Sequence, residues 1–281
     1  MNQEKIDDFY SLMAQASSLT KEKKDDDSLK IYETILKEFE QTDDESIKEY
    51  LPYTYYNKAL VHARRKEFKK ELETYNTLLE KFISNFSKKA ELIIAKAYMN
   101  KAVCIQELYD EKSSLDTYKE FINNFENTID TEILKDLVQA KYNTALIQAS
   151  LDENDEAIKK YDEIINTYRN SEDETILEFV IKSLVNKANK QKELFEYEDS
   201  LKTFDEVLNS FSNLKGVFLG QIAIAYHNKA AVLSELQREN DLQNVCDEII
   251  EKFSNINDEF IINIVSSAEV LKDKDRFNNS F

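Results

Sequence analysis

Asparagine recurs along this chain at a nearly constant interval. Successive members of the set are separated by 43, 43, 43 and 42 residues: Asn57, Asn100, Asn143, Asn186 and Asn228. A side-chain amide carries two N–H donors and a carbonyl acceptor, so it can pair with both the C=O and the N–H of another main chain. A regular row of these amides predicts a ladder that holds an extended polypeptide. The alternative is that each asparagine hydrogen-bonds within its own pair of helices and fixes their packing angle.

Side chains at fixed offsets from each asparagine share its helix face. Positions four and one residues before it, and three, six and seven residues after it, lie on the same side of a helix. We call this set the asparagine face. Besides the five asparagines, the side chains that we predict to contact a ligand there are Tyr53, Tyr56, Arg64, Lys96, Tyr142, Lys182, Asn189 and Lys192. Four of these are basic, and the face also carries Glu107, Glu193 and Glu235, so it is close to neutral.

The sequence offers little for catalysis. Its two histidines, His62 and His227, occupy different positions of distant repeats, so they predict neither a paired general base nor a metal site. Two glycines in the whole chain leave no glycine-rich phosphate loop. Acidic runs such as Asp43-Asp44-Glu45 are explained by helix N-termini, where negative charge is favourable. We therefore expect no catalytic residue, no metal and no cofactor, and the chain is not expected to be an enzyme.

The bulk composition argues against several classes of partner. A net charge of −18 is unfavourable for nucleic-acid binding, which requires a positive surface. No apolar run approaches the roughly 18 residues that span a bilayer, and the start of the sequence lacks the basic and apolar regions of a secretory signal. Cys104 and Cys246 show no sign of pairing. We predict a cytoplasmic protein that binds neither nucleic acid nor membrane, with its oligomeric state left open.

A second pattern with the same period predicts the elements that position these side chains. Aromatic residues recur 43 positions apart, each within an apolar stripe of helical spacing: Tyr32, Tyr75, Tyr118, Tyr161 and Phe204. We predict that this stripe is buried core. A small residue follows each asparagine by two positions, where helices must cross closely: Ala59, Ala102, Ala145, Ala188 and Ala230. Helix pairs that repeat at a fixed period predict a stacked solenoid.

One unit shows where its helices should begin and break. Asp43, Asp44 and Ser46 offer side chains that can cap a helix N-terminus. Pro52 falls inside the helical pattern that follows, so it should kink or split that helix. Lys66-Glu67 should form the turn to the second helix.

The repeated pattern resembles the tetratricopeptide repeat. In one unit the matching residues are Asn57, the small Ala59, the aromatic Tyr75 sixteen residues later, and Leu79 four residues beyond it. The resemblance covers about residues 3–255, in six units. The period of 43 exceeds the usual 34 because the first helix is longer, and the usual alanine of the second helix survives only as Ala157. This variant looks like bacterial members of the family.

The resemblance implies a fold and a binding face. The expected architecture is all-α: a right-handed superhelical solenoid of about six antiparallel helix pairs, closed by a C-terminal capping helix over 257–271. Residues 1–271 would form a single domain, and 272–281 a polar, flexible tail. The asparagine face would line the concave groove, and some superhelical members of the family use such asparagine ladders.

Binding is therefore the predicted activity. We expect a scaffold or adaptor whose groove holds a peptide or a segment of a partner protein. Two alternatives remain open at this point: a regulatory or sensory array that binds a small molecule, and a purely architectural part of a larger assembly.

Overall fold

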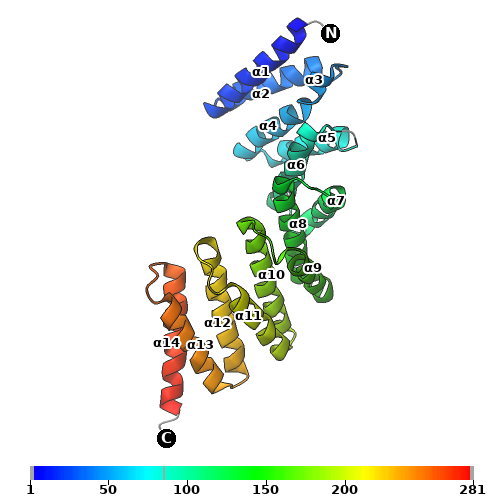
Figure 1. The fold of residues 1–281 in the computed structure, drawn as a ribbon. Helices are drawn as coiled ribbons and strands as arrows, with labels where there is room; N and C mark the ends of the chain where they lie inside the picture. The colour runs from blue at the N-terminus through cyan, green and yellow to red at the C-terminus, as the bar shows by residue number, and fades with distance from the viewer. Residues whose placement is uncertain (1–2, 85, 279–281) are drawn as a thin grey trace. The chain divides into compact units, whose positions relative to one another are not determined.

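The computed structural model describes residues 3–84 and 86–278, and the side chains among them up to residue 272. All regular elements in this part of the chain are helical (Figure 1). In chain order they are α1 (Gln3–Lys21), α2 (Asp25–Phe39), α3 (Glu45–Lys48), α4 (Leu51–Arg64), α5 (Phe68–Phe82), α6 (Lys88–Leu108), η1 (Lys112–Ser114), α7 (Leu115–Phe125), α8 (Thr131–Ser150), α9 (Asn154–Tyr168), α10 (Glu174–Glu193), α11 (Tyr197–Phe211), η2 (Gly216–Phe218), α12 (Leu219–Glu235), α13 (Glu239–Phe253) and α14 (Glu259–Asn278).

The helices form successive antiparallel pairs, as predicted. The pairs are α1–α2, α4–α5, α6–α7, α8–α9, α10–α11 and α12–α13, and α14 follows the last of them (Figure 1). Five of the six second helices have 15 residues each, which shows how regular the unit is. The chain is therefore an all-α solenoid of helix pairs.

The chain divides into two compact units, residues 1–140 and 141–281. We call them unit 1 and unit 2 and describe each by itself; α8 spans the boundary. The single domain over 1–271 stays a prediction. Helix α14 continues through residues 272–278 of the predicted tail. The last three residues of that tail, 279–281, lie outside the described part of the chain.

Capping side chains explain where α8, α10 and the short α3 begin. Asp44, Asp130 and Asp173 each accept hydrogen bonds from backbone N–H groups two or three residues later, at 2.9 to 3.2 Å. These bonds satisfy N–H groups that have no partner inside the helix. Pro52 lies in the first turn of α4, and the short α3 precedes it. The prediction that Pro52 splits this helix is confirmed.

The turns inside five of the pairs use a backbone conformation that favours glycine, yet none has one. The second residue after the first helix lies in the left-handed region, with φ between 55° and 63°, at Lys23, Lys66, Asp152, Phe195 and Gln237. The next N–H then donates to a carbonyl five residues back, as from Glu67 to His62 at 2.9 Å. This motif satisfies carbonyls at the helix end and reverses the chain tightly.

The predicted core is confirmed. The five recurrent aromatic residues of the second helices are at most 2% exposed, and the five alanines that follow the asparagines are at most 1% exposed. Tyr32, Tyr75 and Tyr161 also interact with the first helix of the following pair, through Arg64, Asn100 and Asn186, respectively. Neighbouring pairs therefore share in the environment of these rings, as in other stacked repeats. Both cysteines, Cys104 and Cys246, are buried free thiols.

Within the described residues, none of the helices combines the length and the apolar character that crossing a bilayer requires.

Candidate interaction face

In unit 1, the asparagine face is formed by α4 and α6. Asn100 donates from Nδ2 to the hydroxyl oxygen of Tyr56, at 3.1 Å, and so links the two first helices. Burial raises the pKa of the Tyr56 hydroxyl, and the amide of Asn100 opposes that rise. This contact joins two predicted ligand residues to each other. Asn100 also interacts with the buried hydroxyl of Tyr75, where it opposes the rise in pKa that burial causes. The carbonyl of Asn100, which can accept two hydrogen bonds, is therefore the group left for other partners.

Tyrosines line the first part of the same face. Tyr53 donates from its hydroxyl to the carbonyl of Lys89, at 2.6 Å, and this bond ties α4 to the start of α6. Tyr50 packs against both Tyr10 and Tyr53, with ring centroids 5.5 and 5.6 Å apart. Tyr10 and Tyr50 were not among the predicted site residues, although Tyr50 precedes Asn57 by seven residues and so lies on its face.

Lys96 lies beside a carboxylate that the sequence analysis missed. Its Nζ is 3.9 Å from Asp136, whose side chain is 19% exposed. Burial raises the pKa of Asp136, and the charge of Lys96 works against that rise. Asp136 precedes Asn143 by seven residues, the same offset as Tyr50 from Asn57. Extending the face by one helical turn would have found both.

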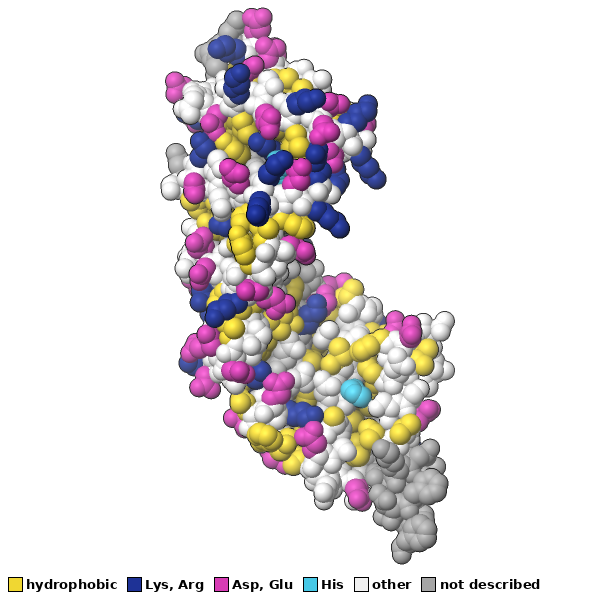
Figure 2. All heavy atoms as spheres, turned by 180° about the vertical axis from the view of Figure 1, so that it is seen from behind, with side chains coloured by type: hydrophobic (Ala, Val, Ile, Leu, Met, Phe, Trp, Pro, Cys, Tyr) yellow, Lys and Arg dark blue, Asp and Glu magenta, His cyan; other side chains and the backbone are white. Residues whose placement is uncertain are grey.

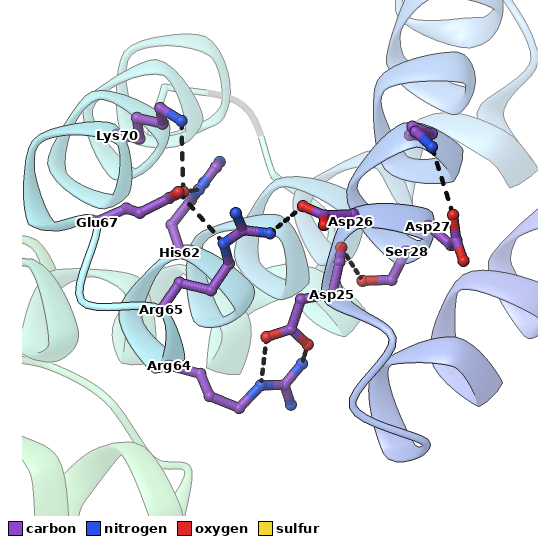
Figure 3. A network of polar contacts seen from close by, with 10 residues as sticks. Asp25, Asp26, Asp27, Ser28, His62, Arg64, Arg65, Glu67 and Lys70 are labelled. Atoms are coloured by element: carbon purple, nitrogen blue, oxygen red, sulfur yellow. Dashed lines mark hydrogen bonds and ion pairs between the residues drawn. The ribbon is translucent and has the colours of Figure 1, made fainter.

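Arg64 holds two helix pairs of unit 1 together. Its guanidinium forms two bonds with the carboxylate of Asp25 at the start of α2, one of them from Nε at 3.2 Å (Figure 3). It also donates to the carbonyl of Thr20 at 3.2 Å. The neighbouring Arg65 pairs with Asp26 in the same network (Figure 3). The predicted ligand contact of Arg64 therefore competes with a bidentate structural pair.

In unit 2, the asparagine face repeats the tyrosine contact. Asn186 donates from Nδ2 to the hydroxyl of Tyr142, at 2.8 Å. Phe179 packs on the Tyr142 ring at 5.4 Å, and the ammonium of Lys182 lies 5.2 Å from the centre of the Phe179 ring. Lys182 also pairs with Glu178 at 2.7 Å. After Tyr50 and Asp136, Phe179 is the third side chain that the sequence analysis missed seven residues before an asparagine.

The next pair of first helices carries a different contact. Asn228 donates from Nδ2 to Oδ1 of Asn189, at 2.8 Å, because Val185 stands where Tyr142 stands one repeat earlier. Lys192 pairs with Glu235 at 2.7 Å. Burial and the charge of Lys192 lower the pKa of His227, so this imidazole is neutral near pH 7.

Apolar side chains emerge beside the asparagines. Leu60, Val103 and Leu146, each three residues after an asparagine, are 38%, 51% and 38% exposed. Asn57 and Asn143 are half-buried, like the other three asparagines. On the side of the molecule drawn in Figure 2, hydrophobic side chains reach the surface in several places between acidic and basic ones. The face therefore offers amides and apolar groups together.

All four predicted basic residues of the face lie close to acids. Arg64, Lys96, Lys182 and Lys192 pair with Asp25, Asp136, Glu178 and Glu235, respectively. The sequence predicted a nearly neutral face from the count of charges alone. The structure adds that each positive charge is balanced locally.

The lysine that follows the asparagine behaves in the same way. Lys187 pairs with Asp162 at 2.6 Å, Lys229 with Asp205 at 2.7 Å, and Lys58 approaches Glu33 at 3.7 Å. Each acid directly follows the buried aromatic residue of the preceding second helix. These contacts lie between neighbouring helices and away from the asparagine face.

No cluster of three or more histidine, cysteine or acidic side chains suited to a metal ion occurs among the described residues. His62 is 5% exposed, and its Nδ1 lies 2.7 Å from Glu67.

Comparison with known families gives one partial match. A family model described as anaphase-promoting complex subunit 5 matches residues 55–143 and 124–192. A comparison with curated proteins finds no match for this sequence.

Solved structures share the fold. The apo form of RapI superposes with a TM-score of 0.62 at 14% identity, covering 91% of this chain and 79% of RapI. BtubC (BKLC) from P. vanneervenii superposes with a TM-score of 0.57 at 14% identity, covering 96% of this chain and 93% of BtubC. The apo form of the quorum sensor NprR from B. thuringiensis superposes with a TM-score of 0.52 at 13% identity, covering 95% of this chain and 82% of NprR. At these sequence identities, the similarity to the three structures is a similarity of fold.

Proposed function

We propose that this chain, a tetratricopeptide-type repeat protein in its fold, is a protein-interaction module. Its asparagine face holds an extended segment of a partner polypeptide, and it acts as a scaffold or adaptor.

The observation that carries this proposal is the recurrence of one chemical pattern along the first helices. Five of the six first helices present a half-buried amide, and three of these five add an exposed apolar side chain three residues later. An extended polypeptide alternates backbone polar groups with side chains at about 3.3 Å per residue. Repeated amides and apolar groups suit such a ligand better than they suit a compact small molecule.

The hydrogen bonds between first helices refine the proposal. Asn100 and Asn186 each donate one N–H to a tyrosine hydroxyl. The tyrosine orients the amide. The carbonyl is left to accept from a ligand main chain, because Asn100 also interacts with Tyr75 and Asn186 with Tyr161. The alternative, in which the asparagines only fix helix packing, predicts that these bonds account for the whole role of the amides.

The solved neighbours support a binding role in a general way. RapI and the quorum sensor NprR are both described as apo forms, a term used for a protein without its ligand. Similarity at 13–14% identity supports the class of function and leaves the ligand to be found by experiment.

The test separates ligand binding from packing. Random peptides displayed on phage are selected on the immobilised chain, and the best binders are titrated against variants. Asn100→Ala and Asn186→Ala should each weaken binding by about tenfold. The matched variants Tyr56→Phe and Tyr142→Phe remove the same internal bond but keep the amide, so binding should change less than about threefold. Equal losses in both sets, or the selection of no peptide, would refute the proposal.

We also propose that the chain binds without catalysing a reaction, and that it works in the cytoplasm. The buried position of His62 against Glu67 supports a structural role for that imidazole. The two buried free thiols fit a reducing compartment.

A further inference from the structure

One turn of unit 2 carries a side chain unlike its counterparts. Phe195 has a φ of 63° and occupies the same left-handed position as Lys23, Lys66, Asp152 and Gln237 in other repeats. A bulky residue is unusual at positive φ, and glycine would adopt this conformation at lower cost. The other repeats place polar side chains at this exposed turn, whereas this one places an aromatic ring.

The Phe195 side chain is not used by the fold. The residue is 77% exposed, and its one ring contact among the described residues is an edge-on contact with Tyr197 at 6.2 Å. Because water covers most of the ring, it contributes little apolar burial to the folded state. A strained backbone that exposes an aromatic ring points to a binding role.

Phe195 borders a hollow of about 490 Å³ at the end of the asparagine face. Phe195 and Tyr197 form one side of it, and Asn189 and Asn228 form another. Asn228 donates to Asn189, which leaves Oδ1 of Asn228 and the N–H groups of Asn189 without a hydrogen bond within the described residues. Together they offer one acceptor and donors, the complement of a single peptide unit.

The charges around the hollow are balanced. Lys192 pairs with Glu235 at 2.7 Å, and Glu193 pairs with Lys190 at 2.6 Å. A charged side chain entering the hollow would lose water without gaining an unpaired opposite charge. An uncharged apolar side chain can pack on the two aromatic rings at no such cost.

We propose that this hollow is a subsite for one bulky apolar residue, aromatic or aliphatic, of an extended partner segment. The backbone of that residue pairs with Asn189 and Asn228, and its side chain packs on Phe195 and Tyr197. This inference rests on the proposed function, because it names the residue that the partner segment presents at one place on the asparagine face.

The smallest probe that carries both features is N-acetyl-phenylalanine methylamide, which has an aromatic side chain between two peptide units. In NMR spectra of the full chain, this probe should shift the side-chain amide signals of Asn189 and Asn228. The leucine analogue should do the same, and the lysine, glutamate and glycine analogues should bind more weakly by about threefold or more. Equal shifts from the lysine or glutamate analogue, or no shift at Asn189 and Asn228, would overturn the inference.

Variants at the turn supply the control. Phe195→Gln introduces glutamine, the residue type that Gln237 provides at the equivalent turn of another repeat. The variant should therefore fold with an unchanged melting temperature. It should bind the phenylalanine probe about three to ten times more weakly. Phe195→Gly removes the ring and relieves the left-handed backbone, so it should melt at the same or a higher temperature and lose the same binding. Unchanged probe binding in both variants would contradict the proposal.

The peptide selection distinguishes a failure of the subsite from a failure of the proposed function. Peptides that bind the wild-type chain and depend on Phe195 should share a large apolar residue. If selected peptides depend on Asn100 and Asn186 but bind Phe195→Gln equally well, the subsite is wrong and the proposed function stands. If the probe binds at the hollow but no peptide is selected, the apolar subsite is supported and the proposed function fails.

Discussion

Tyrosine hydroxyls orient two of the recurrent amides. Tyr56 accepts from Asn100 at 3.1 Å and Tyr142 accepts from Asn186 at 2.8 Å, both at half-buried positions. Replacing either tyrosine with phenylalanine leaves an amide N–H short of its partner, so the free energy of unfolding should fall by about 1 kcal/mol. Urea denaturation measures this change. Tyr109→Phe is the control, because that ring is 66% exposed and its loss of a hydroxyl should be neutral.

Glu71 is an acid in the core of unit 1. It is 5% exposed and stands where the repeat usually has a small residue. Burial raises the pKa of its carboxyl, the Cys104 thiol opposes that rise, and the charge of Glu107 adds to it. Tyr75 also lies close enough for the charge of Glu71 to raise the pKa of its hydroxyl. Glu71 therefore binds its proton more tightly in the folded state than in the unfolded state.

The raised pKa of Glu71 determines whether the free energy of unfolding rises or falls with pH. When the folded state binds more protons than the unfolded state, stability falls as pH rises from the unfolded pKa through the folded one. Glu71→Gln should match the wild type near pH 4 and exceed its unfolding free energy by about 1 kcal/mol near pH 8. Urea denaturation of both proteins across that range tests this. A variant that is less stable at the higher pH would show that the ionised carboxylate is favourable there.

At the scale of helices, Arg64 docks the first pair of unit 1 against the second. Its side chain is 37% exposed and that of its partner Asp25 is 18% exposed, so the pair is partly shielded from solvent. Arg64→Lys keeps the charge but loses the bidentate geometry. We expect faster amide hydrogen exchange in α1 and α2, corresponding to about 0.5–1 kcal/mol. Arg65→Lys is the matched control for the contact between pairs, since its partner in α2, Asp26, is 79% exposed and its other partner, Glu67, belongs to its own pair. This variant should have a smaller effect on α1 and α2.

Helix faces were predictable because each depends only on position in the sequence. The buried aromatic residues, the capping Asp44 and the break at Pro52 all follow from local rules. The partners of the face residues were not predicted, because they come from the neighbouring pair. Their separations are close to one repeat, as in the 44 residues between Tyr56 and Asn100. The turn at Phe195 was missed because no glycine marks its left-handed backbone.

At the scale of the whole molecule, the architecture is shared and the surface is specific. The fold alone selects no single activity, because one architecture can carry many functions. This chain combines local charge balance on the asparagine face with a net charge of −18 overall. The excess acidic side chains must therefore lie outside that face, where their negative charges repel one another.

That self-repulsion predicts a response to salt. Screening weakens repulsion between exposed charges over distances of about 10 Å at 0.1 M ionic strength. With 55 acidic and 37 basic residues, repulsion should outweigh the exposed ion pairs, so the melting temperature should rise between low and moderate NaCl. A gain of 1 kcal/mol corresponds to roughly 2–4 °C. Scanning calorimetry in NaCl measures the rise, and sulfate is avoided because it strengthens apolar burial by itself. A melting temperature that falls with NaCl would mean that the interhelical ion pairs, such as Lys187 with Asp162 and Lys229 with Asp205, dominate the electrostatics of the folded chain.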